Sequence, residues 1–256
     1  MANWVLTGLR TGIKSSVYPN RTDETLGVSP GRPRGTSLRS PEEADVLVGR
    51  CPAGAITHGE SGVAVDHARC IHCYRCYTAV DVPRVAWDED YEWGVHPDRV
   101  AAARSKLDRA FGRSLHIRFI DAGACGACIG EARQLNNPYY NLHRLGFFIT
   151  PTPRNADILL VAGPVSDGMR LALCKAYEAM PTPKRVVAIG VCAISGGVFG
   201  PSFACGTVAE HVPVDVVVPG CPPPPLAILH GLLVVVGRKP PSRLASPPAN
   251  VDASSA

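Results

Sequence analysis

Four cysteines in the second half of the chain constrain its fold more than any other feature. Cys125 and Cys128 lie in the glycine-rich segment 121–131, directly after an alternating apolar run, and Cys192 and Cys221 each follow a later apolar run. In open α/β sheets, ligands bind at the carboxyl ends of the strands, so three such junctions would bring these thiols together. We therefore interpret the four cysteines as ligands of one buried iron–sulfur cluster.

The composition is that of a folded protein and narrows the function classes. The 256 residues are 46% apolar and 19% charged, with a net charge of +4, and they suffice for one or two domains. There is no basic stripe with interleaved aromatic residues, so we expect no nucleic-acid partner. Ten cysteines without a signal peptide favour metal ligands or redox thiols over a disulfide scaffold. The strongest apolar run, 227–237, is shorter than the roughly 20 residues of a membrane span.

Residues 1–40 predict an extended arm, because they are rich in Gly, Pro, Arg, Ser and Thr and show little periodicity. A short amphipathic helix fits 4–13. Docking of the arm on another subunit is the simpler interpretation, and contact of the helix with a membrane surface is the alternative.

A second group of cysteines, Cys51, Cys70, Cys73 and Cys76, matches half of a ferredoxin pattern. Bacterial two-cluster ferredoxins carry the run C-x2-C-x2-C-x3-C-P, whose fourth cysteine binds the other cluster. Here the triplet reads C-I-H-C-Y-R-C, and the C-P cysteine stands upstream of it. The same template places the four ligands of the other cluster at Pro41, Ala44, Leu47 and Val80. This part therefore resembles a two-cluster bacterial ferredoxin that has kept one 4Fe-4S centre.

A structural zinc site is the competing interpretation of these cysteines. Zinc sites usually pair two C-x2-C units, whereas a triplet with a distant C-P cysteine fits an iron–sulfur cluster better. The segment between Cys51 and the triplet predicts two short strands around a glycine turn. We expect His72, inside the triplet, to be a solvated spacer, because the cysteines already fill the site.

From residue 115 onward, the pattern predicts alternating strands and helices. We expect strands at 115–121, 146–149, 157–162, 185–191 and 213–218, and helices at 129–143, 167–179 and 226–237. Such alternation is typical of a parallel sheet covered on both faces. A further helix at 98–112 is expected to be a spacer between the two parts. Cys174 is expected to be a buried core side chain and Cys205 a free thiol.

Four motifs in this half resemble one known family. They are D-A-G-A-C-G-A-C-I-G-E at 121–131, P-T-P-R-N-A-D-I-L-L-V-A-G-P-V at 151–165, I-G-V-C-A-I-S-G-G-V-F at 189–199 and V-P-V-D-V-V-V-P-G-C-P-P-P-P at 212–225. They are similar, in the same order, to the small-subunit family shared by group 4 membrane-associated nickel–iron hydrogenases and the quinone-proximal iron–sulfur subunit of respiratory NADH–quinone oxidoreductase. The C-x-x-C spacing sides with the hydrogenase branch, because the NADH–quinone oxidoreductase subunit has two adjacent cysteines there.

The resemblance implies a flavodoxin-like α/β fold in which Cys125, Cys128, Cys192 and Cys221 bind a 4Fe-4S cluster. It also puts Glu131 where the family has a glutamate near the path to the catalytic subunit, which implies a proton-relay or interface role. An acid favoured by a helix N-terminus is the plainer alternative. The N-terminal module is a departure from the family, because in hydrogenase and formate hydrogenlyase complexes a separate subunit has that role.

We accordingly expect a flavodoxin-like parallel-sheet domain preceded by a small α+β domain like a bacterial ferredoxin. The expected regions are an arm with the ferredoxin-like domain at 1–95, a linker helix at 96–114, the small-subunit domain at 115–240 and a disordered tail at 241–256.

These features predict an electron-transfer subunit of a membrane-associated oxidoreductase, similar to a hydrogenase or formate hydrogenlyase. Two 4Fe-4S clusters would pass electrons between a hydrogenase-like large catalytic subunit, similar to the 49 kDa subunit of complex I, and a further carrier. Membrane subunits are expected partners, with quinone and ferredoxin as further candidates. The expected location is cytoplasmic, on the inner face of the cell membrane. The alternatives are a complex I-type quinone-reducing subunit and a zinc-binding structural adaptor; the chain has no complete active site.

Overall fold

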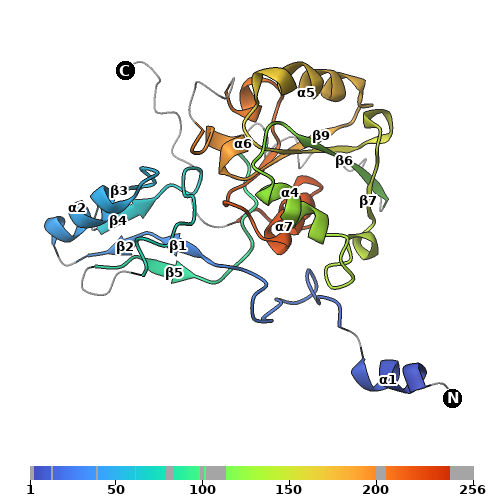
Figure 1. The fold of residues 1–256 in the computed structure, drawn as a ribbon, viewed down its shortest axis with the longest axis horizontal. Helices are drawn as coiled ribbons and strands as arrows, with labels where there is room; N and C mark the ends of the chain where they lie inside the picture. The colour runs from blue at the N-terminus through green and yellow to red at the C-terminus, as the bar shows by residue number, and fades with distance from the viewer. Residues whose placement is uncertain are drawn as a thin grey trace.

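The structure, a computed structural model, describes residues 3–12, 14–38, 40–60, 62–78, 83–98, 101, 114–199 and 206–242. Its main body is a five-stranded sheet in the C-terminal half, in which all neighbouring strands are parallel (Figure 1). The strands, in spatial order, are β7 (Phe147–Ile149), β6 (Leu115–Asp121), β8 (Ile158–Ala162), β9 (Arg185–Ile189) and β10 (Val216–Val218). Counted along the chain, this order is 2-1-3-4-5.

Helices cover both faces of this sheet (Figure 1). On one face lie α4 (Ala127–Gln134) and α7 (Pro225–Val235), and on the other α5 (Asp167–Ala179) and α6 (Val191–Ser195). Alternate residues of β8 contribute to the two apolar layers: Ile158 and Leu160 pack with α7, and Leu159 and Val161 with α5 and α6. Because both faces are covered, the central strands are continuous buried apolar runs.

The predicted strands and most helices of this half are confirmed, with two corrections. The helix expected at 129–143 ends at Gln134, because Pro138 disfavours helical backbone at the residue before it. Only the 3-10 turn Leu142–Leu145 follows. The strand expected at 185–191 ends at Ile189, because Gly190 adopts a φ of 85° and α6 begins at the next residue. Two further 3-10 turns are Pro153–Asn155 and Val208–Glu210.

The N-terminal half contains two small antiparallel sheets and helix α2 (Pro41–Arg50). The sheets are formed by β1 (Arg32–Arg34) with β5 (Ala86–Asp88), and by β2 (Thr36–Ser37), β4 (Gly62–Val65) and β3 (Ile56–Gly59). The β3–β4 hairpin confirms the predicted strand pair. Helix α2 was not predicted, although Ser40 before Pro41 and the acids that follow are start signals.

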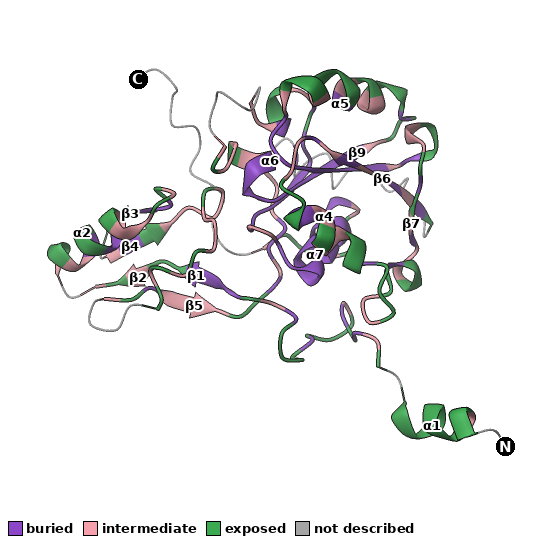
Figure 2. Cartoon of the chain, viewed as in Figure 1, coloured by how far each residue is buried: buried purple, intermediate pink, exposed green. Residues whose placement is uncertain are grey.

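A separate small core holds this half together. Ala44 and Leu47 on α2 pack against Ile56, Val63 and Val85, and all five are at least nine-tenths buried. Two of the positions at which the ferredoxin template expects cysteines are therefore apolar core residues of a helix. Figure 2 shows the much larger buried region in the C-terminal half.

Part of the arm packs against its own chain, and its docking on another subunit stays a prediction. Asp23 is buried and accepts hydrogen bonds from Ser16 Oγ (2.5 Å) and from Tyr139 Oη (2.8 Å) of the C-terminal half. The predicted N-terminal helix is present as α1 (Asn3–Thr11), which stands apart from the body and has no buried residue (Figure 1).

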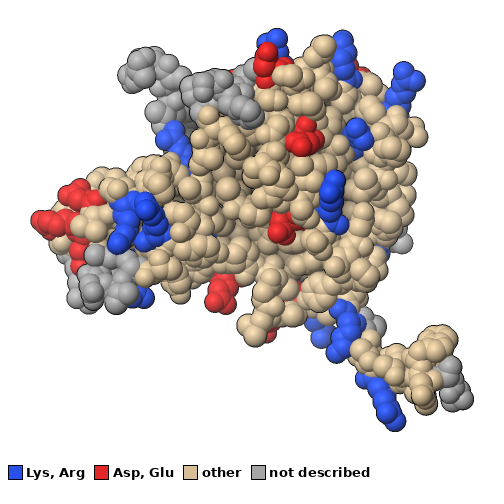
Figure 3. All heavy atoms as spheres, in the orientation of Figure 1, with Lys and Arg blue, Asp and Glu red and all other residues tan. Residues whose placement is uncertain are grey.

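Several expectations lie outside the described residues: most of the helix at 98–112, the tail from 243 onward, Val80 and Cys205. None of the helices in the described ranges combines the length and apolar character needed to cross a bilayer. On the face seen in Figure 3, lysine and arginine are interspersed with acidic side chains.

Candidate metal centres

The C-terminal site, defined as Cys125, Cys128, Cys192 and Cys221, begins where β6 leads into α4. Asp121, the last residue of β6, accepts hydrogen bonds at Oδ1 from the backbone N–H groups of residues 123 (2.9 Å) and 124 (2.7 Å). This turn presents Cys125 on the surface, and α4 carries Cys128 buried in its first turn. The strand end therefore delivers one exposed thiol and one buried thiol.

Cys192 and Cys221 reach the same place from two neighbouring strands. Cys192 is buried in α6, which begins directly after Gly190, and Cys221 follows β10. A Cβ atom added at Gly190 would lie 2.6 Å from Cys128 Sγ, and one added at Gly197 would lie 2.6 Å from Cys192 Sγ. Both glycines have positive φ values, 85° and 60°. The backbone thus approaches two sulfur atoms more closely than a larger residue would allow.

Burial and mutual repulsion both disfavour free thiolates at this site. Burial raises the pKa of Cys128 to about 12, and the charges of the other three cysteines add to the effect. Burial, followed by the charges of Cys221 and Cys125, raises the pKa of Cys192 to about 11. These mutual effects place the four sulfur atoms in one electrostatic environment. A bound cationic centre would reverse both penalties, because metals bind the deprotonated thiol.

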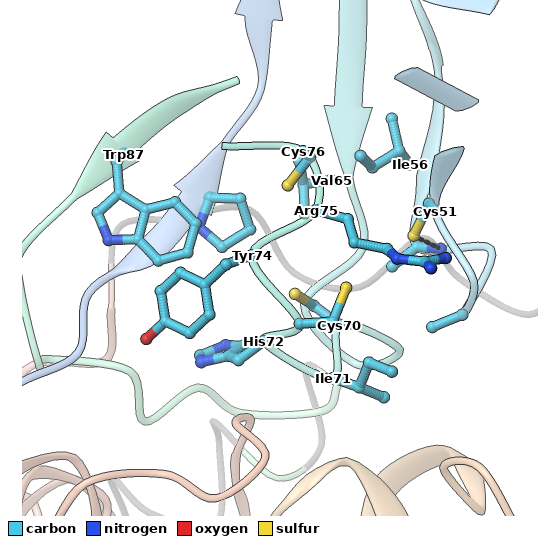
Figure 4. A pocket seen from close by; sticks show the side chains of 14 residues that line it. Cys51, Ile56, Val65, Cys70, Ile71, His72, Tyr74, Arg75, Cys76 and Trp87 are labelled. Atoms are coloured by element: carbon cyan, nitrogen blue, oxygen red, sulfur yellow. Dashed lines mark hydrogen bonds between the residues drawn. The ribbon is translucent and has the colours of Figure 1, made fainter. Parts of the chain in front are cut away.

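The N-terminal site, defined as Cys51, Cys70, Cys73 and Cys76, surrounds a small cavity of about 20 Å³. Figure 4 shows the sulfur atoms of Cys51, Cys70 and Cys76 around the same space. Cys51 directly follows α2, and its Sγ accepts a hydrogen bond from the backbone N–H of residue 55 at 3.2 Å. Burial raises the pKa of Cys70 to about 12, and the charges of the other three cysteines add to this. Both cysteine groups named from the sequence are therefore gathered by the fold.

The loop of the N-terminal site has an unusual backbone between its cysteines. His72 and Tyr74 have φ values of 51° and 61°, a left-handed conformation that costs roughly 1–2 kcal/mol for a residue with a side chain. Such strain persists where the surroundings fix it. The backbone of His72 hydrogen-bonds the sulfur of Cys70, and the ring of Tyr74 stacks on Trp87 with centroids 5.0 Å apart. The loop is thus shaped around the sulfur atoms.

The prediction that His72 is a solvated spacer is wrong. Its ring lies edge-on to Trp93, with ring centroids 5.3 Å apart, and burial lowers its pKa to about 4. Its Nδ1 atom is buried and has no hydrogen-bond partner among the described residues. The physical reason is tertiary: the loop packs against the other half of the chain, which local sequence does not reveal.

Residues from both halves of the chain line one cavity of about 450 Å³, the shared cavity. His72 and Tyr74 of the N-terminal loop line one part of it, and Glu131, Tyr140 and Cys221 line another. Burial raises the pKa of the Glu131 carboxyl. Glu131 therefore lies beside Cys221 of the C-terminal site in a partly desolvated position, and its expected role stays a prediction.

Other groups are not drawn into either site. Cys174 is only half-buried on α5, which corrects the expectation of a core residue. Among the described residues, no three His, Cys, Asp or Glu side chains converge tightly enough to hold a single metal ion. The sequence did not identify Gly190 and Gly197 as parts of the site. The available signal was their position within five residues of Cys192 in the motif at 189–199.

The donor chemistry of both sites fits an iron–sulfur cluster. Each offers four thiols, the ligand set of a 4Fe-4S cluster, and soft thiolates select iron–sulfur clusters, zinc or copper(I). At the C-terminal site, Gly190 and Gly197 lie so close to two of the sulfur atoms that neither position could carry a side chain.

Together, the fold and the sites define a class: an α/β protein whose parallel sheet gathers four cysteines at its strand ends, preceded by a second four-cysteine module. The family model described as NADH ubiquinone oxidoreductase, 20 Kd subunit, matches residues 125–235. The chain belongs to this family, because it also covers most of the length of a relative with 41% identity.

That relative is named "Probable membrane-bound hydrogenase subunit mbhJ" of Pyrococcus furiosus, and the match of 133 residues covers 52% of this chain and 80% of the relative. Formate hydrogenlyase subunit 7 of Escherichia coli is 36% identical over 141 residues, with 55% of each chain covered. The chain thus spans about half the length of that relative. A chain in the structure of the membrane-bound sulfane sulfur reductase, an archaeal respiratory membrane complex, is similar with 31% identity and a TM-score of 0.43, over 56% of this chain and 78% of that one.

Proposed function

We propose that this chain is an electron-transfer subunit of a membrane-associated oxidoreductase complex related to hydrogenases, and that it carries two 4Fe-4S clusters. The observation that carries the proposal is that the fold gathers each group of four cysteines in one place, with Cys221 and the N-terminal cysteine loop lining a common cavity. Family membership and the names of the relatives support the class of complex. The domain bounds 1–95, 96–114 and 115–240 belong to the same proposal.

The sheet order supports a flavodoxin-like C-terminal domain. The order 2-1-3-4-5 is that of flavodoxin-like doubly wound sheets, in which ligands bind beyond the strand ends next to the switch in strand order. Here the cysteines follow β6, β9 and β10 at those ends. We assign Cys125, Cys128, Cys192 and Cys221 as the ligands of one cluster.

The N-terminal module is proposed to hold one cluster, bound by Cys51, Cys70, Cys73 and Cys76. The second cluster of a ferredoxin template would need ligands where this chain has Ala44 and Leu47 in an apolar core. Helix α2 therefore takes the place of a ligand loop, and the module keeps the remaining half of the template.

The exposure of the cysteines supports a direction through the chain. Each proposed cluster supplies one reversible one-electron step at a potential set by its protein environment. Cys73 and Cys125 are the exposed ligands of their sites, so they mark the two outward ends. Cys221 and the loop residue His72 line the shared cavity, and so lie on the inward side. The buried thiols Cys128 and Cys192 exclude water.

The outward ends suggest the partners. We infer that the large catalytic subunit docks beside the C-terminal site and that a further carrier, such as a ferredoxin, docks beside Cys73. Glu131 borders the C-terminal site, and burial raises its pKa, which fits a carboxyl that becomes enclosed at an interface or takes part in a proton relay. Membrane subunits of the complex would then keep the chain at the inner face of the cell membrane.

Purification of the tagged chain from the membranes of its host tests this function. We expect a hydrogenase-like large subunit to copurify and the complex to exchange electrons with a viologen dye. Cys192→Ala should abolish exchange between the dye and the catalytic subunit, while Cys174→Ala, the matched control on α5, should leave it intact. Full exchange in the Cys192→Ala complex would contradict the proposal. Quinone reduction as the main activity would favour the complex I-type alternative.

A further inference from the structure

We propose that His72 and Trp93 are positioning residues that fix the N-terminal cysteine loop against the C-terminal domain, and thereby set the separation of the two proposed clusters. The effect on cluster separation rests on the proposed function, because it requires both clusters to be present. The contact itself is a property of the chain. Trp93 belongs to the linker segment, defined as residues 91–95, and His72 belongs to the cysteine loop, defined as residues 70–76.

The linker segment is anchored in the C-terminal domain at three consecutive residues. Val95 exchanges two backbone hydrogen bonds with Val217, at 3.0 and 2.9 Å, and so extends the edge of the sheet beside β10. The N–H of Gly94 donates to Nδ1 of the buried His230 on α7 at 2.9 Å. Trp93 is fully buried in the same apolar cluster as α7. The segment is therefore part of the C-terminal core, although it precedes that domain in sequence.

Close packing leaves no slack at this anchor. A Cβ atom at Gly94 would lie 2.8 Å from Cα of Gly231 on α7, so the linker backbone touches the helix backbone. His230 also bonds the other way, because its Nε2 lies 3.1 Å from the carbonyl oxygen of Pro240. Since Nδ1 accepts from Gly94, Nε2 carries the proton in this arrangement. The imidazole of His230 therefore connects the linker segment to Pro240.

The buried indole of Trp93 is held in one orientation by polar neighbours. Its Nε1 donates to Oδ1 of Asp90 at 3.0 Å. Asp90 in turn pairs with the buried guanidinium of Arg32 at 2.9 Å, and that guanidinium lies over the indole at 5.4 Å from the ring centroid. Because Arg32 belongs to β1 of the N-terminal half, the indole is fixed from both halves.

His72 is the residue through which the cysteine loop meets this anchor. It stands between Cys70 and Cys73, and its left-handed backbone turns a ring toward the other half of the chain. The ring contacts the indole edge-on, at an interplanar angle of 72°. Aromatic pairs favour this geometry, which makes the contact directional. A strained residue of the cysteine loop thus places its ring against the linker segment of the neighbouring domain.

A second, smaller contact joins the two sites on another side. Ser195, on the helix that carries Cys192, donates from Oγ to the carbonyl oxygen of Ala68 at 2.7 Å, two residues before Cys70. The chain that leads into the cysteine loop is therefore held at Ala68 as well as at His72. The shared cavity lies beside these contacts, lined by His72 and Cys221.

The test compares His72→Ala, His72→Phe and Trp93→Leu, with His58→Ala as the matched control from an exposed histidine of the same module. Three readouts are taken on the full chain: iron content, the magnetic coupling between the two reduced clusters in EPR, and hydrogen exchange of peptides covering 66–78 and 91–95. We expect His72→Ala and Trp93→Leu to lose the resolved coupling and to exchange several-fold faster. His72→Phe, which keeps a ring, and the control should match wild type.

The outcomes separate this proposal from the proposed function. Wild-type coupling and exchange in both His72→Ala and Trp93→Leu would overturn the positioning role. A wild-type content of about four irons in place of about eight would refute the two-cluster function. With only one cluster present, hydrogen exchange is the readout that tests the contact between His72 and Trp93. Faster exchange in His72→Ala and Trp93→Leu supports that contact, and unchanged exchange refutes it. If His72→Ala loses iron, Trp93→Leu, which changes no residue of the cysteine loop, gives the decision.

Discussion

Substitution of Gly190 by alanine should empty the C-terminal site and spare the N-terminal one. Gly190 has a φ of 85° and a ψ of 150°, a region that side chains essentially never occupy. The added Cβ would also lie 2.6 Å from Cys128 Sγ. Backbone strain of about 1–3 kcal/mol and overpacking of about 1–3 kcal/mol together give roughly 2–6 kcal/mol, concentrated at one ligand. The strain and the overlap are both reduced most simply if the Cys128 thiol moves out of the site.

The assay is anaerobic iron and sulfide quantification of Gly190→Ala beside Gly130→Ala. Gly130 lies on α4, two residues from Cys128, and a Cβ there meets nothing within 4 Å. The control should keep wild-type iron and gain about 0.5–1 kcal/mol of stability, because alanine is the better helix former. We expect Gly190→Ala to fall from about eight irons per chain to about four. Full iron content in Gly190→Ala would refute the reasoning that this glycine makes room for the site.

Three further predictions concern the architecture. His230 stays neutral in the folded protein because burial lowers its pKa to about 4, whereas the same side chain in the unfolded chain takes up a proton near pH 6.5. The free energy of unfolding should therefore fall by about 2 kcal/mol between pH 7.5 and pH 5. In urea denaturation, His230→Gln should remove this part of the pH dependence. Leu47→Ala should cost about 2–5 kcal/mol in the same experiment, because it opens a cavity in the small core, and a loss below 1 kcal/mol would contradict that core. Asp23→Ala leaves Tyr139 Oη without its acceptor and should cost about 1–3 kcal/mol and speed hydrogen exchange of 14–25, whereas exchange equal to wild type would show that the arm is held elsewhere.

Sequence periodicity predicts the C-terminal sheet well because its strands are fully buried. Runs such as Ile158–Ala162 are apolar throughout, and helix α5 begins at Asp167 with an acidic first turn and ends before Pro181. The spacing of cysteines likewise predicts both sites, since the ligands follow strand ends or a known ferredoxin run. Short elements are harder to predict from sequence. Helix α6 has only five residues, and its apolar residues continue the pattern of the preceding strand.

The features that sequence did not reveal are tertiary. His72 resembles a solvated spacer in its local context, and its partial burial depends on a tryptophan in the linker segment. Helix α2 is short, and its apolar signal is limited to residues such as Ala44 and Leu47, which are three apart and share one face. The ferredoxin template therefore dominates the interpretation of this segment. The glycine approach to Cys128 depends on a neighbouring strand, so no local pattern could predict it.

The central claim is that one chain holds two clusters in distinct sites. The most direct measurement is iron and acid-labile sulfide per chain, with EPR of the reduced protein, for wild type, Cys73→Ala and Cys192→Ala. The account predicts about eight irons in wild type and about four in each variant, with a different part of the EPR signal lost in each. About four irons in wild type, all lost in Cys192→Ala, would mean that the N-terminal site binds no cluster, and zinc in place of iron would contradict electron transfer altogether.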